Sequence, residues 1–202
     1  MTDAQLIRRV IKPALWILGL APLLYLVNRI RLGDLGFDPI RTVTHFTGRT
    51  AIIILFITLT VTPVRRISGW NPLIKVRRLI GLFAFFYATL HFLIYAVFDR
   101  ELSLAGLGED IAKRPWITVG FTVFLILLTL AITSPQAMVR KLGKRWQTLH
   151  RLIYLAAGLA VLHFTWAQKK DISLPLAYAA VLAVILGSRL MLRRGKAVRG
   201  ER

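Results

Sequence analysis

Six long stretches without a charged residue dominate this 202-residue chain, which is 56% hydrophobic. A helix needs about 20 mostly apolar residues to cross a membrane. The stretches are 13–28, 50–64, 79–98, 115–139, 152–168 and 172–188. The first two are short, and flanking arginines such as Arg29 and Arg49 must reach back to the interface. We therefore predict an all-α membrane protein, a bundle of six transmembrane helices in one domain over residues 1–202.

The net charge of +19 follows this six-span pattern. Alternate connections, together with the two terminal segments, hold 19 of the 28 Lys and Arg residues. Seven of the nine Asp and Glu residues lie in the other connections. Basic residues collect on the cytoplasmic side of membrane proteins, so we predict that both termini are cytoplasmic. This distribution favours membrane topology and contact with anionic lipid over nucleic-acid binding.

Cysteine is absent from the chain. Its absence excludes disulfides, cysteine-ligated iron–sulfur clusters and covalent attachment of haem through a C-x-x-C-H motif. Any haem must therefore be held by ligation and packing alone. We also find no internal repeat and no nucleotide-binding glycine motif.

Two of the four histidines lie within uncharged stretches at matching depth. His91 is 13 residues beyond Arg78 and His163 is 12 residues beyond Arg151, about 20 Å and about 18 Å along a helix. Both helices run in the same direction, so the two imidazoles should be almost level in the outer half of the membrane. An imidazole in hydrocarbon needs a partner, and two level imidazoles can ligate one haem iron from opposite faces. The pair predicts a haem suited to electron transfer.

The other two histidines lie nearer the ends of their helices. His150 lies 13 residues before His163, so it could hold a second haem near the cytoplasmic face. No histidine stands at the matching depth of the third helix, where Arg77 is the residue expected near the haem. His45 opens the second helix and is a further residue expected near the outer haem.

Several motifs resemble the YedZ/MsrQ family of the ferric-reductase-like transmembrane group, over nearly the whole chain. They are H-F-T-G-R (45–49), T-P-V-R-R (62–66), R-R-L-I-G-L-F-A-F-F-Y-A-T-L-H-F-L-I-Y (77–95) and W-Q-T-L-H-R-L-I-Y-L-A-A-G-L-A-V-L-H-F-T-W (146–166). The resemblance implies a multi-pass protein of the bacterial inner membrane that binds one or two b-type haems and FMN. His91 and His163 correspond to the family's haem ligands, with His150 the candidate for a second haem.

The resemblance also implies a role in protein repair. A member of this family passes electrons from the quinone pool, or from a cytoplasmic flavin reductase, to the periplasmic molybdopterin enzyme MsrP. That partner reduces methionine sulfoxide in oxidised envelope proteins. The membrane subunit is itself a non-catalytic electron carrier, and we expect the segment 99–114 to dock its partner.

Three alternatives remain open at this stage. The first is a quinol-oxidising cytochrome b that anchors another periplasmic oxidoreductase. The second is a transporter that uses its histidines for protons or metal ions, although the apolar stretches contain no Asp or Glu for a proton relay. The third is a purely structural membrane anchor, which leaves the two buried histidines unexplained.

Overall fold

The computed structural model describes residues 2–168 and 171–198, and these residues contain helices and no strand. Six helical segments are long and apolar enough to cross a membrane, which confirms the predicted architecture. They are Asp3–Arg31, Pro39–Ser68, Asn71–Asp99, Pro115–Ile132, Lys144–Ala167 and Ser173–Leu192. The C-terminal Arg199 and Arg202 of the predicted basic tail lie outside the described residues.

The α-helices follow one another with short connections. In chain order they are α1 (Asp3–Leu6), α2 (Lys12–Arg31), α3 (Pro39–Ser68), α4 (Arg77–Ile94), α5 (Leu104–Lys113), α6 (Pro115–Ile132), α7 (Gln136–Leu142), α8 (Lys144–Leu149), α9 (Leu152–Ala167) and α10 (Ser173–Val198). One π-helical turn, Ile7–Ile11, joins α1 to α2, and another, Tyr95–Asp99, extends α4. A 3-10 turn, Asn71–Val76, leads into α4.

Several helix boundaries differ from the uncharged stretches, and two of these differences have a clear local cause. The second stretch begins at residue 50, but α3 begins at Pro39, because the Asp38 side chain accepts a hydrogen bond from the Arg41 amide at 3.0 Å. The fourth stretch runs to residue 139, but α6 ends at Ile132. Pro135 has no amide hydrogen and disfavours a helical residue before it, so the chain turns and restarts as α7.

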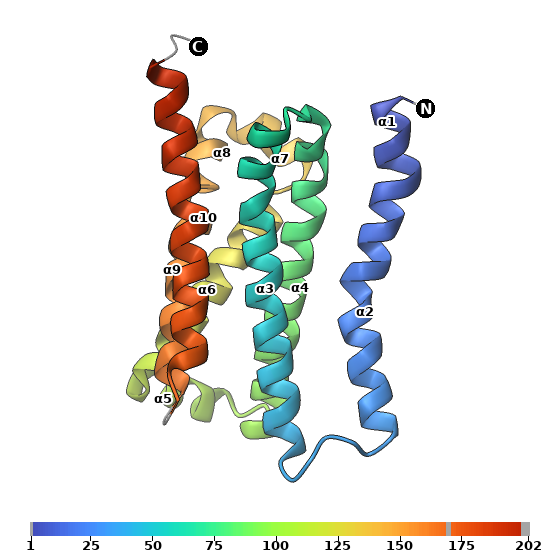
Figure 1. The fold of residues 1–202 in the computed structure, drawn as a ribbon. Helices are drawn as coiled ribbons and strands as arrows, with labels where there is room; N and C mark the ends of the chain where they lie inside the picture. Colours follow the sequence, from blue (N-terminus) through green and yellow to red (C-terminus); the bar gives the residue numbers. More distant parts are fainter. Residues whose placement is uncertain (1, 169–170, 199–202) are drawn as a thin grey trace.

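Two helix pairs form the centre of the bundle. α3 packs along α4, α6 packs along α9, and α4 joins the two pairs through its contact with α6. Small side chains allow this close packing, since Ala84, Ala156 and Ala157 are fully buried in the main apolar core. α10 covers α3 and α9, whereas α2 stands at the edge of the bundle (Figure 1).

A buried tyrosine of α4 hydrogen-bonds to the backbone of α2. The Tyr87 hydroxyl accepts a hydrogen bond from the Leu23 amide at 3.0 Å and donates one to the Gly19 carbonyl at 2.7 Å. It therefore stands between two backbone groups that are four residues apart, next to Pro22 within α2.

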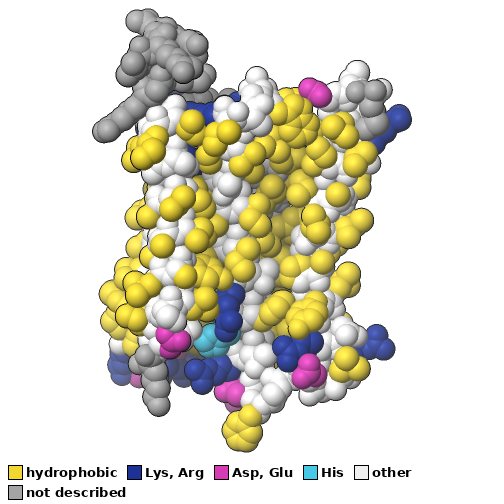
Figure 2. Space-filling model, viewed as in Figure 1, with side chains coloured by type: hydrophobic (Ala, Val, Ile, Leu, Met, Phe, Trp, Pro, Cys, Tyr) yellow, Lys and Arg dark blue, Asp and Glu magenta, His cyan; other side chains and the backbone are white. Residues whose placement is uncertain are grey.

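The two ends of the bundle differ. α1 begins and α10 ends at one end, which we call the terminal end, and α5 lies across the opposite end, which we call the α5 end (Figure 1). Figure 2 shows hydrophobic side chains over the middle of this face, while charged side chains gather toward the two ends. This arrangement suits a protein whose middle is in contact with lipid.

Candidate haem site

His91 and His163 meet near the α5 end of the bundle. His91 lies in the last turn of α4, and His163 lies one turn before the end of α9. Their ring centroids are 6.1 Å apart and the ring planes meet at 75°. The structure thus brings together the two imidazoles that the sequence places at matching depth.

Each imidazole has one nitrogen hydrogen-bonded to a backbone carbonyl. Nδ1 of His91 lies 2.9 Å from the Thr44 carbonyl oxygen, and Nδ1 of His163 lies 2.7 Å from that of Trp116. A carbonyl oxygen only accepts, so Nδ1 of each ring carries the proton and donates it. Nε2 of each neutral ring then keeps its lone pair, which is the form that binds a metal.

A glycine lies against each histidine ring. A Cβ atom added at Gly48 would lie 3.0 Å from Nδ1 of His91, and one added at Gly120 would lie 2.7 Å from Nδ1 of His163. Each glycine stands four residues after the residue whose carbonyl accepts the imidazole hydrogen bond. On a helix this places the glycine directly over that carbonyl. The missing side chain therefore gives the ring access to the backbone oxygen.

The two halves of the site repeat at a fixed spacing. In each half the histidine is 47 residues beyond its carbonyl partner. The glycines, the histidines and the prolines Pro63 and Pro135 are each separated by 72 residues. The expectation of no internal repeat is therefore wrong. α3 with α4, and α6 with α9, are two versions of one helix pair, each of which supplies one histidine. The repeated elements are few and widely spaced, so they are inconspicuous in the sequence.

The histidine pair borders a cavity of about 450 Å³. Its inner wall is mostly apolar and includes Leu55, Ala88, Phe124, Leu127 and Ala160. Its charged lining residues come from the N-terminal half of α3 and from the 99–114 connection. Pockets for organic cofactors are commonly of this size and character, with a few placed polar groups in an apolar wall.

The residues present fit a haem. A bond of about 2 Å from each imidazole to a shared metal, together with the half-width of each ring, gives a centroid separation of about 6 Å. The observed 6.1 Å agrees with this value. Two histidines are too few for a structural zinc site, which takes four protein ligands. They are sufficient for haem iron, because the porphyrin supplies the remaining four nitrogens.

The other predicted site residues are divided between the two ends. His45 lines the cavity, as does Tyr95, which is one turn beyond His91. His150 and Arg77 do not line it: Arg77 opens α4 at the terminal end. Nε2 of His150 lies 3.1 Å from the Thr133 hydroxyl, and its ring stacks on Trp146 with centroids 4.0 Å apart.

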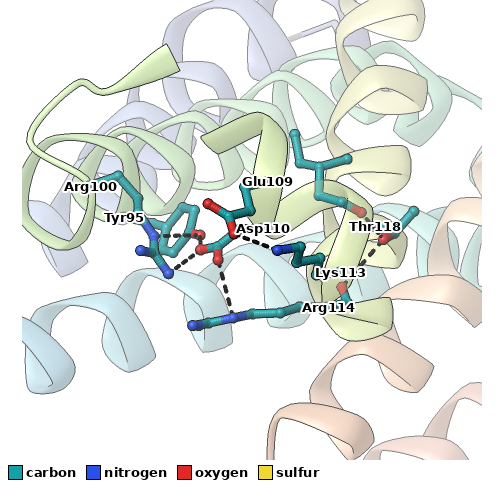
Figure 3. A network of polar contacts seen from close by, with 8 residues as sticks. Tyr95, Arg100, Glu109, Asp110, Lys113, Arg114 and Thr118 are labelled. Atoms are coloured by element: carbon teal, nitrogen blue, oxygen red, sulfur yellow. Dashed lines mark hydrogen bonds and ion pairs between the residues drawn. The ribbon is translucent and has the colours of Figure 1, made fainter. Parts of the chain in front are cut away.

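A polar network next to the cavity was not foreseen from the sequence. The buried Asp110 carboxylate of α5 accepts a hydrogen bond from Tyr95 and pairs with Arg100 and with Arg114, whose Nε is 3.1 Å away (Figure 3). Burial by itself raises the pKa of Asp110, but the Tyr95 hydrogen bond and the charges of Arg114 and Arg100 outweigh it and lower this pKa. The network holds α5 against the end of α4.

Comparison with known proteins gives a consistent result. The family described as "Ferric reductase like transmembrane component" matches residues 47–161, which is more than half of the chain. The chain is 49% identical over 185 residues to the protein-methionine-sulfoxide reductase heme-binding subunit MsrQ of Ralstonia nicotianae, and the alignment covers 90% of this chain and 85% of that relative. It is 44% identical over 192 residues to the MsrQ subunit of Bordetella pertussis, which covers 93% of both.

The MsrQ subunit of Herminiimonas arsenicoxydans is 46% identical over 179 residues, covering 87% of this chain and 82% of the relative. These alignments span most of each protein, and the histidine pair lies in a bundle with the expected number of spans. This chain therefore belongs to the MsrQ family of haem-binding subunits, within the ferric-reductase-like transmembrane group.

Proposed function

We propose that this chain is a b-type cytochrome of the bacterial inner membrane that delivers electrons to the periplasmic molybdopterin enzyme MsrP for methionine sulfoxide reduction. The observation that carries the proposal is the His91–His163 pair, with ring centroids 6.1 Å apart and a matching carbonyl partner for each ring. The relatives are named as heme-binding subunits of a protein-methionine-sulfoxide reductase, which supports this partner.

The residues of the site have distinct tasks. His91 and His163 would hold the iron through Nε2, while the carbonyls of Thr44 and Trp116 fix each ring and would increase its basicity. The apolar wall excludes water from the site. The haem, when bound, supplies the one-electron chemistry, and we assign no catalytic residue to the chain.

We infer that both termini face the cytoplasm. The connections 65–78 and 140–151, which carry ten Lys and Arg residues, lie at the same end as both termini. The α5 end then faces the periplasm, and the histidine pair lies close to it. An electron donor in the cytoplasm or the quinone pool would supply the site from the other side, and MsrP would accept electrons near α5.

Two parts of the sequence prediction remain proposals of their own. His150 is the proposed ligand of a second haem toward the terminal end, although its Nε2 contacts Thr133 in this structure. FMN is implied by the family resemblance alone, and we assign no residues to it. A fall from two haems to one per chain in His150→Ala would support the second site, and an unchanged haem count would reject it.

The first experiment is a reduced-minus-oxidised visible spectrum of the detergent-purified protein, with haem quantified per chain. We expect a low-spin b-type spectrum that is lost in both His91→Ala and His163→Ala and retained in the control His45→Ala. A low-spin spectrum that survives both ligand substitutions would refute the assignment. Co-purification with MsrP, and reoxidation of the haem by MsrP with its substrate, test the partner separately.

A further inference from the structure

The cavity at the histidine pair has its charged lining residues at the α5 end. There are five, two in the N-terminal half of α3 and three in the 99–114 connection, whereas the deeper wall is apolar. They are His45, Arg49, Asp99, Arg100 and Arg114. Three guanidinium groups and one carboxylate, Asp99, therefore line the cavity, and Arg100 and Arg114 share a second carboxylate, Asp110, beside it.

Arg49 is the least compensated of these groups. It forms no ion pair with any carboxylate in the described part of the chain. It follows Gly48, which contacts the His91 ring, and it stands about 15 Å along α3 from the start of that helix. Its side chain is exposed and directly precedes the uncharged stretch 50–64, so Arg49 stands at the boundary of the apolar segment, where its guanidinium is available to a carboxylate ligand.

Arg114 and Arg100 are held in place by protein contacts and yet keep donors to spare. Nε of Arg114 lies 3.1 Å from Asp110, and Nε of Arg100 lies 3.3 Å from the Tyr95 hydroxyl (Figure 3). Arg100, like Arg114, forms an ion pair with Asp110. One carboxylate therefore serves two guanidinium groups, and the terminal nitrogens of Arg114 form no ion pair among the described residues.

We propose that Arg49 and Arg114 bind the two propionate groups of the haem and so fix the porphyrin with its carboxylate edge toward α5. This inference rests on the proposed haem site and adds the orientation of the ring within it. Guanidinium groups suit the task because they donate paired hydrogen bonds to carboxylates. Asp110 and Tyr95 then act as positioning residues, since they reach the propionates only through the arginines.

The test compares haem with its dimethyl ester, in which both propionates are neutral. Each is titrated into the full-length chain purified without haem, and binding is followed by the low-spin spectrum. We expect the wild type to bind haem at least about tenfold more tightly than the ester, as is typical of charge-assisted hydrogen bonds. Arg49→Gln should reduce this preference, and the midpoint potential of its haem should fall because a positive charge near the iron is lost.

Arg31→Gln is the matched control, because Arg31 is an exposed arginine at the same end of the bundle that does not line the cavity. Equal binding of haem and ester by the wild type, with low-spin spectra for both, would overturn the orientation and leave the haem site standing. An undiminished preference for haem in Arg49→Gln would overturn the assignment to Arg49. Failure of the wild type to bind either compound would refute the haem site itself.

Discussion

At the scale of single residues, the site depends on what two positions lack. Gly48 and Gly120 leave two backbone carbonyls uncovered, and each carbonyl fixes the protonation and orientation of one histidine. On the proposed assignment, backbone carbonyls alone hold both imidazoles in the form that binds a metal. Loss of a group that hydrogen-bonds to a metal ligand typically lowers the affinity for the metal 10–100-fold.

Gly120→Ala should displace His163, since the new Cβ would lie 2.7 Å from both Nδ1 and Cε1 of the ring. We expect haem affinity to fall about 10–100-fold and the low-spin spectrum to weaken. Gly48→Ala should have a smaller effect, because its nearest contact is 3.0 Å. Gly158→Ala on α9 is the control, since no atom lies within 4 Å of the added methyl group. A normal spectrum in Gly120→Ala would show that His163 does not need this backbone contact.

At the scale of the helix, α5 is the element that tertiary contacts hold in place. It has ten residues, fewer than an isolated helix needs for stability in water. Its start is capped by the Ser103 side chain, which accepts a hydrogen bond from the Gly106 amide at 3.1 Å. Asp110 supplies the connection to α4 and to the start of α6.

Asp110→Asn should loosen α5. The substitution removes the charge that Arg100 and Arg114 share, so we expect a loss of about 1–3 kcal/mol of stability. The thermal midpoint should fall by about 2–4 °C for each kcal/mol, and proteolysis within 99–114 should become faster. Glu109→Gln breaks only the exposed pair with Lys113 and should change neither measurement. Equal thermal midpoints and equal proteolysis rates for the two variants would show that the Asp110 network does not hold α5 in place.

The same carboxylate gives the α5 contact a pH dependence. Because the pKa of Asp110 is lower in the folded chain, its stabilisation is complete above the ordinary Asp pKa of about 3.9 and is lost as the pH falls through the folded value. Proteolysis of the 99–114 segment by an acid-active protease should therefore accelerate on acidification in the wild type. Asp110→Asn should already be sensitive at neutral pH and change less. An acid response of the same size in Asp110→Asn would assign the effect to other groups.

At the scale of the whole molecule, the charge pattern and the bundle both place the two termini and the two basic connections on the same side of the membrane. We expect a reporter that is active only in the cytoplasm to be active when fused after residue 202. A periplasmic reporter inserted near Gly108, where no atom lies within 4 Å of an added Cβ, should also be active. The converse pattern would show that the bundle has the opposite orientation in the membrane, with the histidine pair near the cytoplasm.

The sequence was sufficient for the six spans and for the histidine pair. Uncharged stretches report contact with lipid directly, and counting residues from the nearest basic residue gives depth, because the rise of a helix is constant. These two regularities predict that His91 and His163 lie level, and the structure brings their rings within reach of one iron.

Other features had no comparable signal. The imidazoles donate to the backbone oxygens of Thr44 and Trp116. Every residue carries such an oxygen, so the residue types at these two positions do not identify them as hydrogen-bond acceptors. The Asp110 network joins residues of three separate segments, and a charged residue in a connection looks like an ordinary exposed residue until the helices are packed.

The division of the ligands between two helix pairs has a consequence for biosynthesis. His91 leaves the ribosome with the third span, but its counterpart His163 belongs to the fifth of six. On the proposed assignment, a nascent chain offers only one axial nitrogen until α9 is inserted. The haem would then be loaded only after α9 has entered the membrane. Its iron would link the half of the chain that is synthesised first to the half that is synthesised later.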